Sequence, residues 1–300
     1  MSLEVEQKDL ASSWMAAARA GDFRRAWQIA DRALRLRGEA TCWHLPRHEQ
    51  WVWDGRPLAD RRVLVRCYHG LGDTIQYARF LPQLQANVVV WAQPELLPLL
   101  RTLPASLELL PLHDGTPETA YDVDLEIMEL GHALRIGLEC LPGPVPYFRV
   151  PRAPRYTSVF SVGLLAQAGE FMAWRSVPAD LLVSSVTGLP VALFGLQLGG
   201  LPGTTDLSTH DVLTLATRLQ ALDLVITADT MVAHLSGALG VPTWTLLPTP
   251  ADWRWMDARA DSPWYPTMRL FRQPSPGDWP SVVDAVRKAL AVVLAARLDA

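Results

Sequence analysis

The pattern of apolar and polar positions changes character near residue 61. Over residues 12–37, Ala and Leu recur at helical spacing, and Gly21–Asp22 interrupts the pattern midway. Gly38 follows the second apolar stretch, at a place where glycine commonly ends a helix. This segment therefore predicts two helices joined by a tight turn.

Short apolar runs replace the helical pattern beyond residue 61. The run "RRVLVRCYHG" is rich in β-branched residues and ends in glycine, which predicts a buried strand, and a helix is expected over about residues 73–84. "NVVVWAQ" predicts the next strand, and the alternation continues through "PELLPLLRTL", "LELLPL" and "YDVDLEIM". This β-α-β-α order indicates an α/β fold with a parallel sheet covered on both faces.

A proline-rich stretch at residues 142–154 divides the chain, and the alternation restarts after it. The second half contains the strand-like runs "SVFSVGLL", "LPVALFGLQ", "LDLVITAD" and "VPTWTLLP". We therefore expect two α/β halves around a cleft, with ligands beyond the carboxyl ends of the strands. The predicted parts are a helical hairpin with a linker, a first α/β domain, a second α/β domain and a C-terminal helix, at residues 1–58, 59–150, 151–279 and 280–300.

Composition and charge narrow the class of protein. The 300 residues include 27 basic and 31 acidic side chains without a basic stripe, which argues against a nucleic-acid partner. Three cysteines without CxxC spacing argue against a disulfide framework or a zinc site, and favour a reducing compartment. There is no signal-peptide core and no run of the ~18 apolar residues that a transmembrane helix needs. We expect a cytoplasmic protein, for which contact with a membrane surface stays open.

The loop "YHGLGDTIQYARF" at residues 68–80 is the first candidate site. It is not a dinucleotide-binding fingerprint, because Ile75 stands where a third glycine or an alanine is needed, and no P-loop motif occurs in the chain. Asp73 opens the following helix, where it either caps free backbone N–H groups or faces the cleft as a general base. The residues alone favour the cap.

A second candidate site lies in "DLVITADTMVAHLSGALGVPTW". A buried strand ends at Asp229 and a helix starts at Thr230 or Met231, so free N–H groups and the helix dipole favour a bound diphosphate. We expect Asp229 to reach a sugar hydroxyl and Thr230 a phosphate oxygen, with His234 one turn further on the same face. The simpler alternative is a capped helix that carries a structural histidine.

Three stretches together resemble the glycosyltransferase-like proteins that follow tetratricopeptide repeats in bacteria: "GLGDTIQYARFLPQL", "DTMVAHLSGALGVPTWTLLP" and "DWRWMDARADSPWYPTMRLFRQPSPGDW". That family is related to the ADP-heptose:lipopolysaccharide heptosyltransferases of glycosyltransferase family 9. The resemblance covers roughly residues 50–280. The helical pair before it looks like a single tetratricopeptide-type unit, which we expect to dock on the next domain because one repeat cannot bury its own apolar face.

The resemblance implies a GT-B fold, in which two Rossmann-like domains face a cleft. It also implies an inverting, metal-independent sugar transfer from a nucleoside-diphosphate sugar, without a cofactor, to a glycan, a lipid-linked molecule or a protein. The implied residues form three sets: Asp73 and His69 for catalysis; Gly70, Gly72, Thr74 and Gln76 in the acceptor-side loop; and Asp229, Thr230, Met231, His234, Gln197, Arg175 and Arg254 for the donor.

The chain departs from this family at positions that matter for chemistry. Tyr68 and His69 replace Glu and Gln, so His69 is either a proton shuttle or hydroxyl contact, or a solvated loop residue. Leu198 stands where relatives carry a lysine facing the diphosphate, and the loop at residues 164–175 is short. The charge of a leaving diphosphate would then be balanced by Arg175 or Arg254.

Two other segments attract attention without changing this prediction. The "DVD" at residues 122–124 matches the metal-binding motif of another glycosyltransferase fold, but it lies inside a predicted strand, so no metal site is expected. In the Trp-rich segment 253–279, Trp253, Arg254 and Trp264 either cover the nucleotide or belong to a structural loop, which is the favoured reading for most of the tryptophans.

The sequence thus predicts a glycosyltransferase in which Asp73 removes a proton from an acceptor hydroxyl and the nucleoside diphosphate leaves toward Thr230. The alternative is a catalytically degenerate GT-B module that binds a nucleotide, a glycan or a protein partner without transfer. Leu198 and the short loop support this alternative. A GT-B sugar epimerase is less favoured, because no suitable acid pair is apparent.

Overall fold

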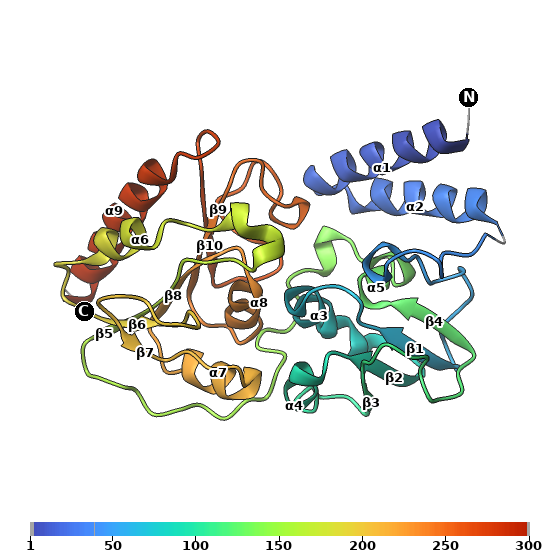
Figure 1. The fold of residues 1–300 in the computed structure, drawn as a ribbon, viewed down its shortest axis with the longest axis horizontal. Helices are drawn as coiled ribbons and strands as arrows, with labels where there is room; N and C mark the ends of the chain where they lie inside the picture. Colours follow the sequence, from blue (N-terminus) through green and yellow to red (C-terminus); the bar gives the residue numbers. More distant parts are fainter. Residues whose placement is uncertain (1–2, 39, 299–300) are drawn as a thin grey trace. The chain divides into compact units, whose positions relative to one another are not determined.

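The computed structural model describes residues 3–38 and 40–298, and the chain divides into two compact units (Figure 1). Unit 1 holds the chain up to Gly143 together with Tyr147–Arg149 and Trp253–Ala258. Unit 2 holds Pro144–Pro146, Val150–Asp252 and the chain from Arg259 onward. Each unit is a mixed α/β structure around a parallel sheet, as the alternating pattern predicts.

Two packed helices, α1 (Leu3–Arg19) and α2 (Phe23–Arg37), lie at the N-terminal side of unit 1. Gly21 turns the chain between them with a φ of 75°, a conformation that favours glycine. Asp22 caps α2 by accepting a 3.0 Å hydrogen bond from the Arg25 N–H.

Side chains of α2 join this helical pair to the rest of unit 1. The Trp27 Nε1–H donates a 2.7 Å hydrogen bond to the Ile136 carbonyl oxygen. The Asp31 carboxylate pairs with His132 and with Arg135, each at 2.8 Å. The helical pair therefore packs as part of unit 1 rather than as a free-standing element.

The sheet of unit 1 has four parallel strands in the order β3-β2-β1-β4. Val63, Leu64 and Val65 of β1 are fully buried, as expected for a strand covered on both faces. The register places Leu64 between Val89 and Asp124 of the neighbouring strands. The strands are β1 (Arg62–Arg66), β2 (Asn87–Ala92), β3 (Glu108–Pro111) and β4 (Val123–Glu126).

The helices that follow these strands are short. The helix expected over residues 73–84 is α3 (Leu71–Tyr77), continued by a 3₁₀ segment at Ala78–Gln83 that contains Pro82. Proline has no N–H, so an α-helix through this position would lose a backbone hydrogen bond. The other helices are α4 (Leu97–Leu100) and α5 (Leu130–Ala133), with 3₁₀ turns at Arg47–Glu49, Pro94–Leu96, Ile127–Glu129, Leu138–Cys140 and Trp253–Trp255.

The sheet of unit 2 has six parallel strands in the order β10-β9-β8-β5-β6-β7. They are β5 (Phe160–Leu165), β6 (Val191–Gly195), β7 (Thr205–Asp206), β8 (Leu224–Ala228), β9 (Thr243–Leu247) and β10 (Met268–Arg272). The helices are α6 (Ala179–Val186), α7 (Val212–Leu219), α8 (Met231–Ala238) and α9 (Trp279–Leu298), with a 3₁₀ segment at Glu170–Arg175. Val286 and Leu290 of α9 are fully buried in the core of this unit.

In both sheets the chain adds strands first on one side of the unit's first strand and then on the other, so the strand order reverses beside that first strand. In unit 1 this point lies between β1 and β4, and in unit 2 it lies between β5 and β8. Such reversal points leave a crevice beyond the carboxyl ends of the two strands, where ligands of doubly wound proteins bind. The two reversal points are therefore the first places to look for a site.

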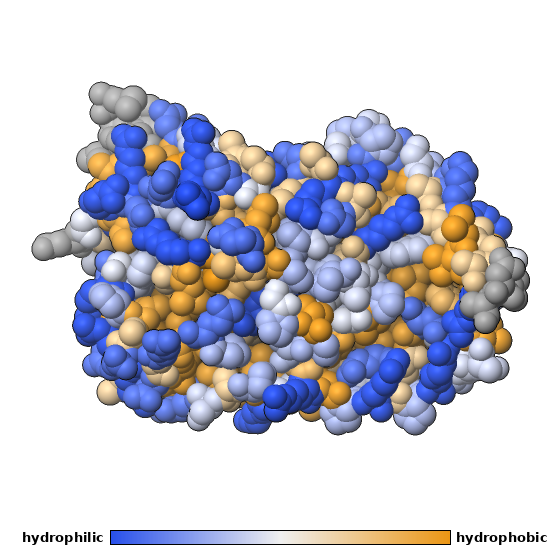
Figure 2. All heavy atoms as spheres, turned by 180° about the vertical axis from the view of Figure 1, so that it is seen from behind, coloured by the Kyte–Doolittle hydropathy of each residue, from blue (hydrophilic) through white to orange (hydrophobic). Residues whose placement is uncertain are grey.

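Within the described chain, no helix combines the length and the apolar character needed to cross a bilayer. On the face shown in Figure 2, polar and apolar side chains are interspersed, and apolar residues gather below the helical pair of unit 1, toward the upper left of the view.

Candidate active site

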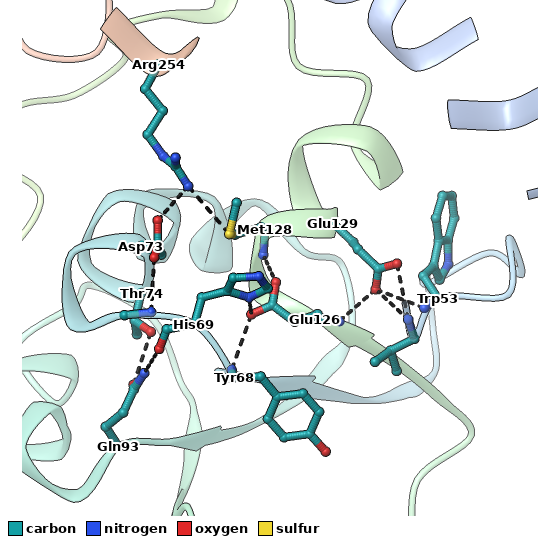
Figure 3. Close-up of polar contacts among 12 residues, drawn as sticks. Trp53, Tyr68, His69, Asp73, Thr74, Gln93, Glu126, Met128, Glu129 and Arg254 are labelled. Carbon is teal, nitrogen blue, oxygen red and sulfur yellow. Dashed lines mark hydrogen bonds and ion pairs between the residues drawn. The ribbon is translucent and has the colours of Figure 1, made fainter. Parts of the chain in front are cut away.

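The reversal point of unit 1 brings together the loop after β1 and the end of β4. Arg66 and Glu126, the last residues of these parallel strands, are direct partners in the register. The chain after β1 continues through Tyr68, His69 and Gly70 into α3. Side chains from the loop, from β4 and from α3 therefore converge at one edge of the sheet (Figure 3).

His69 and Glu126 form an ion pair at this edge. The His69 Nδ1 lies 2.9 Å from Glu126 Oε1, and the Glu126 side chain is almost fully buried. Glu126 also accepts hydrogen bonds from the Tyr68 N–H at 3.3 Å and from the Met128 N–H at 2.7 Å. The backbone thus fixes the carboxylate, and the carboxylate orients the imidazole.

Gln93, which follows β2, holds the backbone of the same loop. Its Nε2 donates a 2.7 Å hydrogen bond to the His69 carbonyl, and its Oε1 accepts one of 3.0 Å from the Thr74 hydroxyl (Figure 3). These two bonds tie the loop to the start of α3. His69 therefore has fixed backbone and side-chain positions, unlike a solvated loop residue.

The environment of His69 favours its charged form. Burial of the imidazole opposes protonation, but the hydrogen bond and the charge of Glu126, with the charge of Asp73 behind them, raise the pKa of His69 above its ordinary 6.5. With Nδ1 directed at Glu126, Nε2 is the nitrogen that can exchange a proton with a ligand.

Asp73 combines a cap with an ion pair. One oxygen, Oδ2, accepts a 3.0 Å hydrogen bond from the Gly70 N–H at the start of α3. The other, Oδ1, lies 2.5 Å from Arg254 Nη2. The buried Arg254 also donates from Nε to Gln76 Oε1 at 2.9 Å. Both Asp73 oxygens thus have partners within unit 1.

Glu129 is a second acidic group behind Glu126, and the sequence pattern does not single it out. Its carboxylate accepts hydrogen bonds from the Trp53 N–H at 2.9 Å, the Glu126 N–H at 2.8 Å and the Val52 N–H at 3.2 Å. Burial raises its pKa to about 7, although the three N–H groups oppose this shift. Glu129 lines a cavity, and the rest of its side chain is surrounded by protein.

The reversal point of unit 2 holds the residues predicted for the donor. Asp229 directly follows β8, and Thr230 caps α8 by accepting a 3.2 Å hydrogen bond from the Val232 N–H. His234, one turn further, lies with Nδ1 2.9 Å from the Tyr265 hydroxyl. The half-buried Met231 is the first residue of the helix.

Arg175 is the arginine of the predicted donor set that belongs to unit 2. It lies 3.2 Å from Asp229 and 3.3 Å from Asp252, so two carboxylates already face its charge. Gln197 follows β6 and accepts a 3.0 Å hydrogen bond from the Gln167 N–H. Leu198 beside it is 49% exposed and, as an apolar side chain, supplies no charge at that position.

The predicted site residues therefore fall into two groups. His69, Gly70, Gly72, Asp73, Thr74 and Gln76 lie together in unit 1, and Asp229, Thr230, Met231, His234, Gln197 and Arg175 belong to unit 2. Arg254, predicted for the donor, lies in unit 1 beside Asp73. The described residues contain no group of three or more His, Cys, Asp or Glu fit to hold a metal, and Asp124 of the "DVD" segment pairs with Arg66 at 2.7 Å.

Glu126, Gln93, Glu129, Asp252 and Tyr265 are site neighbours that the sequence analysis missed. Only Glu126 had a usable signal, an acid at the carboxyl end of an apolar run that predicts a strand. The others reach the sites through contacts between segments far apart in the chain.

Comparison with known proteins shows the fold class. No family model matches the chain, and neither does any curated protein sequence. Among solved structures, the iron-containing dodecameric glycosyltransferase TibC from enterotoxigenic E. coli is similar with a TM-score of 0.55 and 14% identity, over 76% of this chain and 67% of that one.

Two further structures agree with this similarity. E. coli ADP-heptose lps heptosyltransferase II has a TM-score of 0.51 and 17% identity, over 79% of this chain and 99% of that one. The glycosyl transferase family 9 protein of Veillonella parvula has a TM-score of 0.50 and 11% identity, over 73% of this chain and 87% of that one. At these identities the likeness establishes a fold shared with GT-B-like glycosyltransferases.

Proposed function

We propose that the chain is a glycosyltransferase of the heptosyltransferase type. In this proposal it has the GT-B arrangement and transfers a sugar, with inversion and without a metal, from a nucleoside-diphosphate sugar to an acceptor hydroxyl. The observation that carries the proposal is the His69–Glu126 pair at the reversal point of a sheet whose fold is that of such enzymes. Fold likeness alone would not suffice, because one fold serves many functions.

The proposed chemistry is a direct displacement. A base takes the proton of the acceptor hydroxyl, the oxygen attacks the anomeric carbon, and the bond from that carbon to the diphosphate oxygen breaks. The nucleoside diphosphate leaves toward the start of α8, where Thr230 and the helix dipole favour an anion.

His69 is the base that the geometry favours. Glu126 orients its ring from Nδ1 and leaves Nε2 to accept a proton, which is the division of labour in a carboxylate–histidine pair. Asp73 remains the second candidate, but its oxygens already accept from the Gly70 N–H and pair with Arg254. We assign Asp73 and Arg254 to holding the loop in place.

A substitution pair distinguishes these roles. His69→Gln is expected to lower kcat by roughly 10²–10⁴-fold, the usual contribution of a general base. Asp73→Asn should lower kcat less, because the amide oxygen can still accept the Gly70 N–H. A larger loss in Asp73→Asn than in His69→Gln would return the role of base to Asp73.

The donor is testable by calorimetry. ADP, UDP, GDP, CMP and their common sugar conjugates would be titrated into the full chain, beginning with ADP-heptose, because a TibC structure contains ADP-D-β-D-heptose. Saturable binding that is weakened in Thr230→Ala supports a donor site in unit 2. Silence across the panel would remove the transferase proposal.

A degenerate module that binds without transfer is the competing proposal, and one observation favours it. In the described part of the chain, Asp229 and Asp252 both face Arg175, and Arg254 pairs with Asp73. The family resemblance predicts a lysine where this chain has the exposed Leu198, so each predicted cation for a leaving diphosphate is either replaced or already paired. Binding of a sugar nucleotide without turnover, in the presence of any acceptor tested, would decide for this alternative.

A further inference from the structure

Unit 1 contains a cavity of about 580 Å³ next to His69 and Glu126, and most of its lining takes no part in the proposed chemistry. It lies between the helical pair α1–α2, the segment at Gln50–Trp53 and the end of β4. Its volume is within the range of small-molecule sites, which are usually mostly apolar with a few polar groups at defined places.

Five tryptophans line the walls of this cavity: Trp14, Trp27, Trp51, Trp53 and Trp253. They come from four separate parts of the chain, and several contact one another. The Trp14 and Trp253 rings meet edge to face with centroids 5.1 Å apart, and Trp27 stacks on His132 at 5.7 Å. Such walls offer large, rigid apolar faces to rings and hydrocarbon chains.

Polar groups of the candidate active site lie at one side of the same cavity. His69, Glu126 and Glu129 all contribute to its lining. A ligand in the cavity would therefore have one part among tryptophans and another beside the His69 imidazole. Carboxylate oxygens and an imidazole nitrogen are suited to ligand hydroxyl groups, which both donate and accept hydrogen bonds.

The charged groups of the lining pair largely with one another. Among the described residues, Arg37 is the one Lys or Arg side chain of the lining; it donates to the Trp53 carbonyl and interacts with the charge of Glu129. Glu126 pairs with His69, and a pKa of about 7 leaves Glu129 partly neutral, so the described lining has little net charge to attract an anion. A neutral, hydroxylated group joined to an apolar body matches this distribution.

We propose that this cavity binds the acceptor, and that the acceptor is an amphiphilic glycoside with its sugar at His69 and its apolar aglycone among the tryptophans. The role of the glycoside as an acceptor rests on the proposed transferase function. The binding of the glycoside itself does not depend on that function.

The test uses alkyl and aryl glycosides as probes. Octyl β-D-glucopyranoside, octyl β-D-galactopyranoside and phenyl β-D-glucopyranoside, each below its micellar concentration, would be titrated into the full chain by calorimetry. Saturable binding at least about tenfold tighter than that of glucose, galactose or 1-octanol is expected, because only the glycosides satisfy both sides of the cavity. Equal or absent binding across the panel would overturn the proposal.

Two small residues at the cavity permit a matched substitution. Ala11 and Ala33 line it and are exposed, whereas Ala16, which is also exposed and lies on the same helix as Ala11, does not line it. Ala11→Trp and Ala33→Trp should weaken glycoside binding by about tenfold or more, and Ala16→Trp should not. A loss in Ala16→Trp equal to that in both lining variants would contradict a cavity site.

These outcomes separate the two proposals. Glycoside binding together with silence toward all nucleotides keeps the cavity site and removes the transferase function. Nucleotide binding with donor turnover, but no glycoside binding, does the reverse. Because both lining positions are exposed, their substitution is expected to change the free energy of unfolding by no more than about 0.5 kcal/mol, which a melting curve checks.

Discussion

At the scale of single residues, Glu126 is the neighbour that most favours the protonated form of His69. Glu126 is nearly fully buried and bonded to the backbone, so it is a fixed negative charge 2.9 Å from the imidazole. A histidine in this position is protonated over a wider range of pH than one in water.

The first prediction concerns pH dependence. A base must be neutral to act, and the pKa of His69 is raised, so the rate should fall as pH drops through a value above 6.5. Glu126→Gln removes the charge that raises this pKa, so the acid limb of kcat/KM should move to lower pH, with a lower maximum rate. An acid limb that stays in place in the variant would show that another group titrates.

Glu129 leads to a prediction about stability. Its pKa is raised from 4.5 to about 7 in the folded protein, so the folded state binds more protons than the unfolded state between these values. The free energy of unfolding should therefore fall as pH rises from about 4.5 to 7, by up to about 3 kcal/mol from this group. Partial contact of the carboxylate with the cavity would reduce this figure.

Urea unfolding at about pH 4.5 and about pH 8 measures the effect. Glu129→Gln should lose this part of the pH dependence, because glutamine does not titrate. Glu139→Gln, at an exposed position, is the matched control and should behave as the unaltered protein. A variant at position 129 with an unchanged pH profile would contradict the assignment.

At the scale of elements, α8 depends on the absence of a side chain. A Cβ on Gly237 would lie 2.4 Å from the ring of Tyr265, which is fully buried. The close approach allows the Tyr265 hydroxyl to reach His234 at 2.9 Å. Gly237 is therefore required by packing, since a helix interior otherwise disfavours glycine.

Gly237→Ala should accordingly destabilise the protein by about 1–3 kcal/mol, despite the higher helix propensity of alanine. Gly169→Ala is the control, because nothing lies within 4 Å of a Cβ at that position. Urea unfolding midpoints of the two variants give the comparison. A neutral result at position 237 would mean that Tyr265 can shift at little cost.

The comparison of sequence with structure is clearest at this scale. The apolar runs predicted strands β1, β2, β5, β6, β8 and β9, because a strand buried on both faces is apolar along its length. The helix predicted over residues 73–84 changes to a 3₁₀ segment at Ala78, where Pro82 removes a backbone donor. The two-residue β7 has too few residues for any pattern.

In the candidate site, too, the sequence reveals local features but not contacts between distant segments. His69 and Asp73 were identified from one loop, because a polar residue between a strand and a helix is a local signal. Their partners Glu126 and Arg254 lie 57 and 181 residues away in the chain, and no periodicity reports such pairing. The association with tetratricopeptide repeats and the cytoplasmic location stay predictions.

At the scale of the whole molecule, the segment Trp253–Ala258 belongs to unit 1 although it lies within the second half of the chain. Trp253 packs against Trp14 at 5.1 Å and against Phe23 at 6.3 Å, and it is 6% exposed. Trp253→Ala should therefore cost about 3–5 kcal/mol of unfolding free energy.

Trp43→Ala provides the control, because Trp43 also belongs to unit 1 but is 53% exposed. Its loss is expected to cost less than about 1 kcal/mol in urea unfolding. Similar costs in the two variants would mean that the returning segment contributes little to unit 1.

The same returning segment sets an order of events during synthesis. Residues up to 149 supply all of unit 1 except Trp253–Ala258, so this unit emerges from the ribosome without Arg254, which pairs with Asp73, and without Trp253, which packs on Trp14. At ~5–20 residues per second, the missing segment follows only several seconds later. Until then Asp73 and Trp14 lack these contacts, so the packing of the helical pair and of the loop after β1 is completed only when the second half has been made.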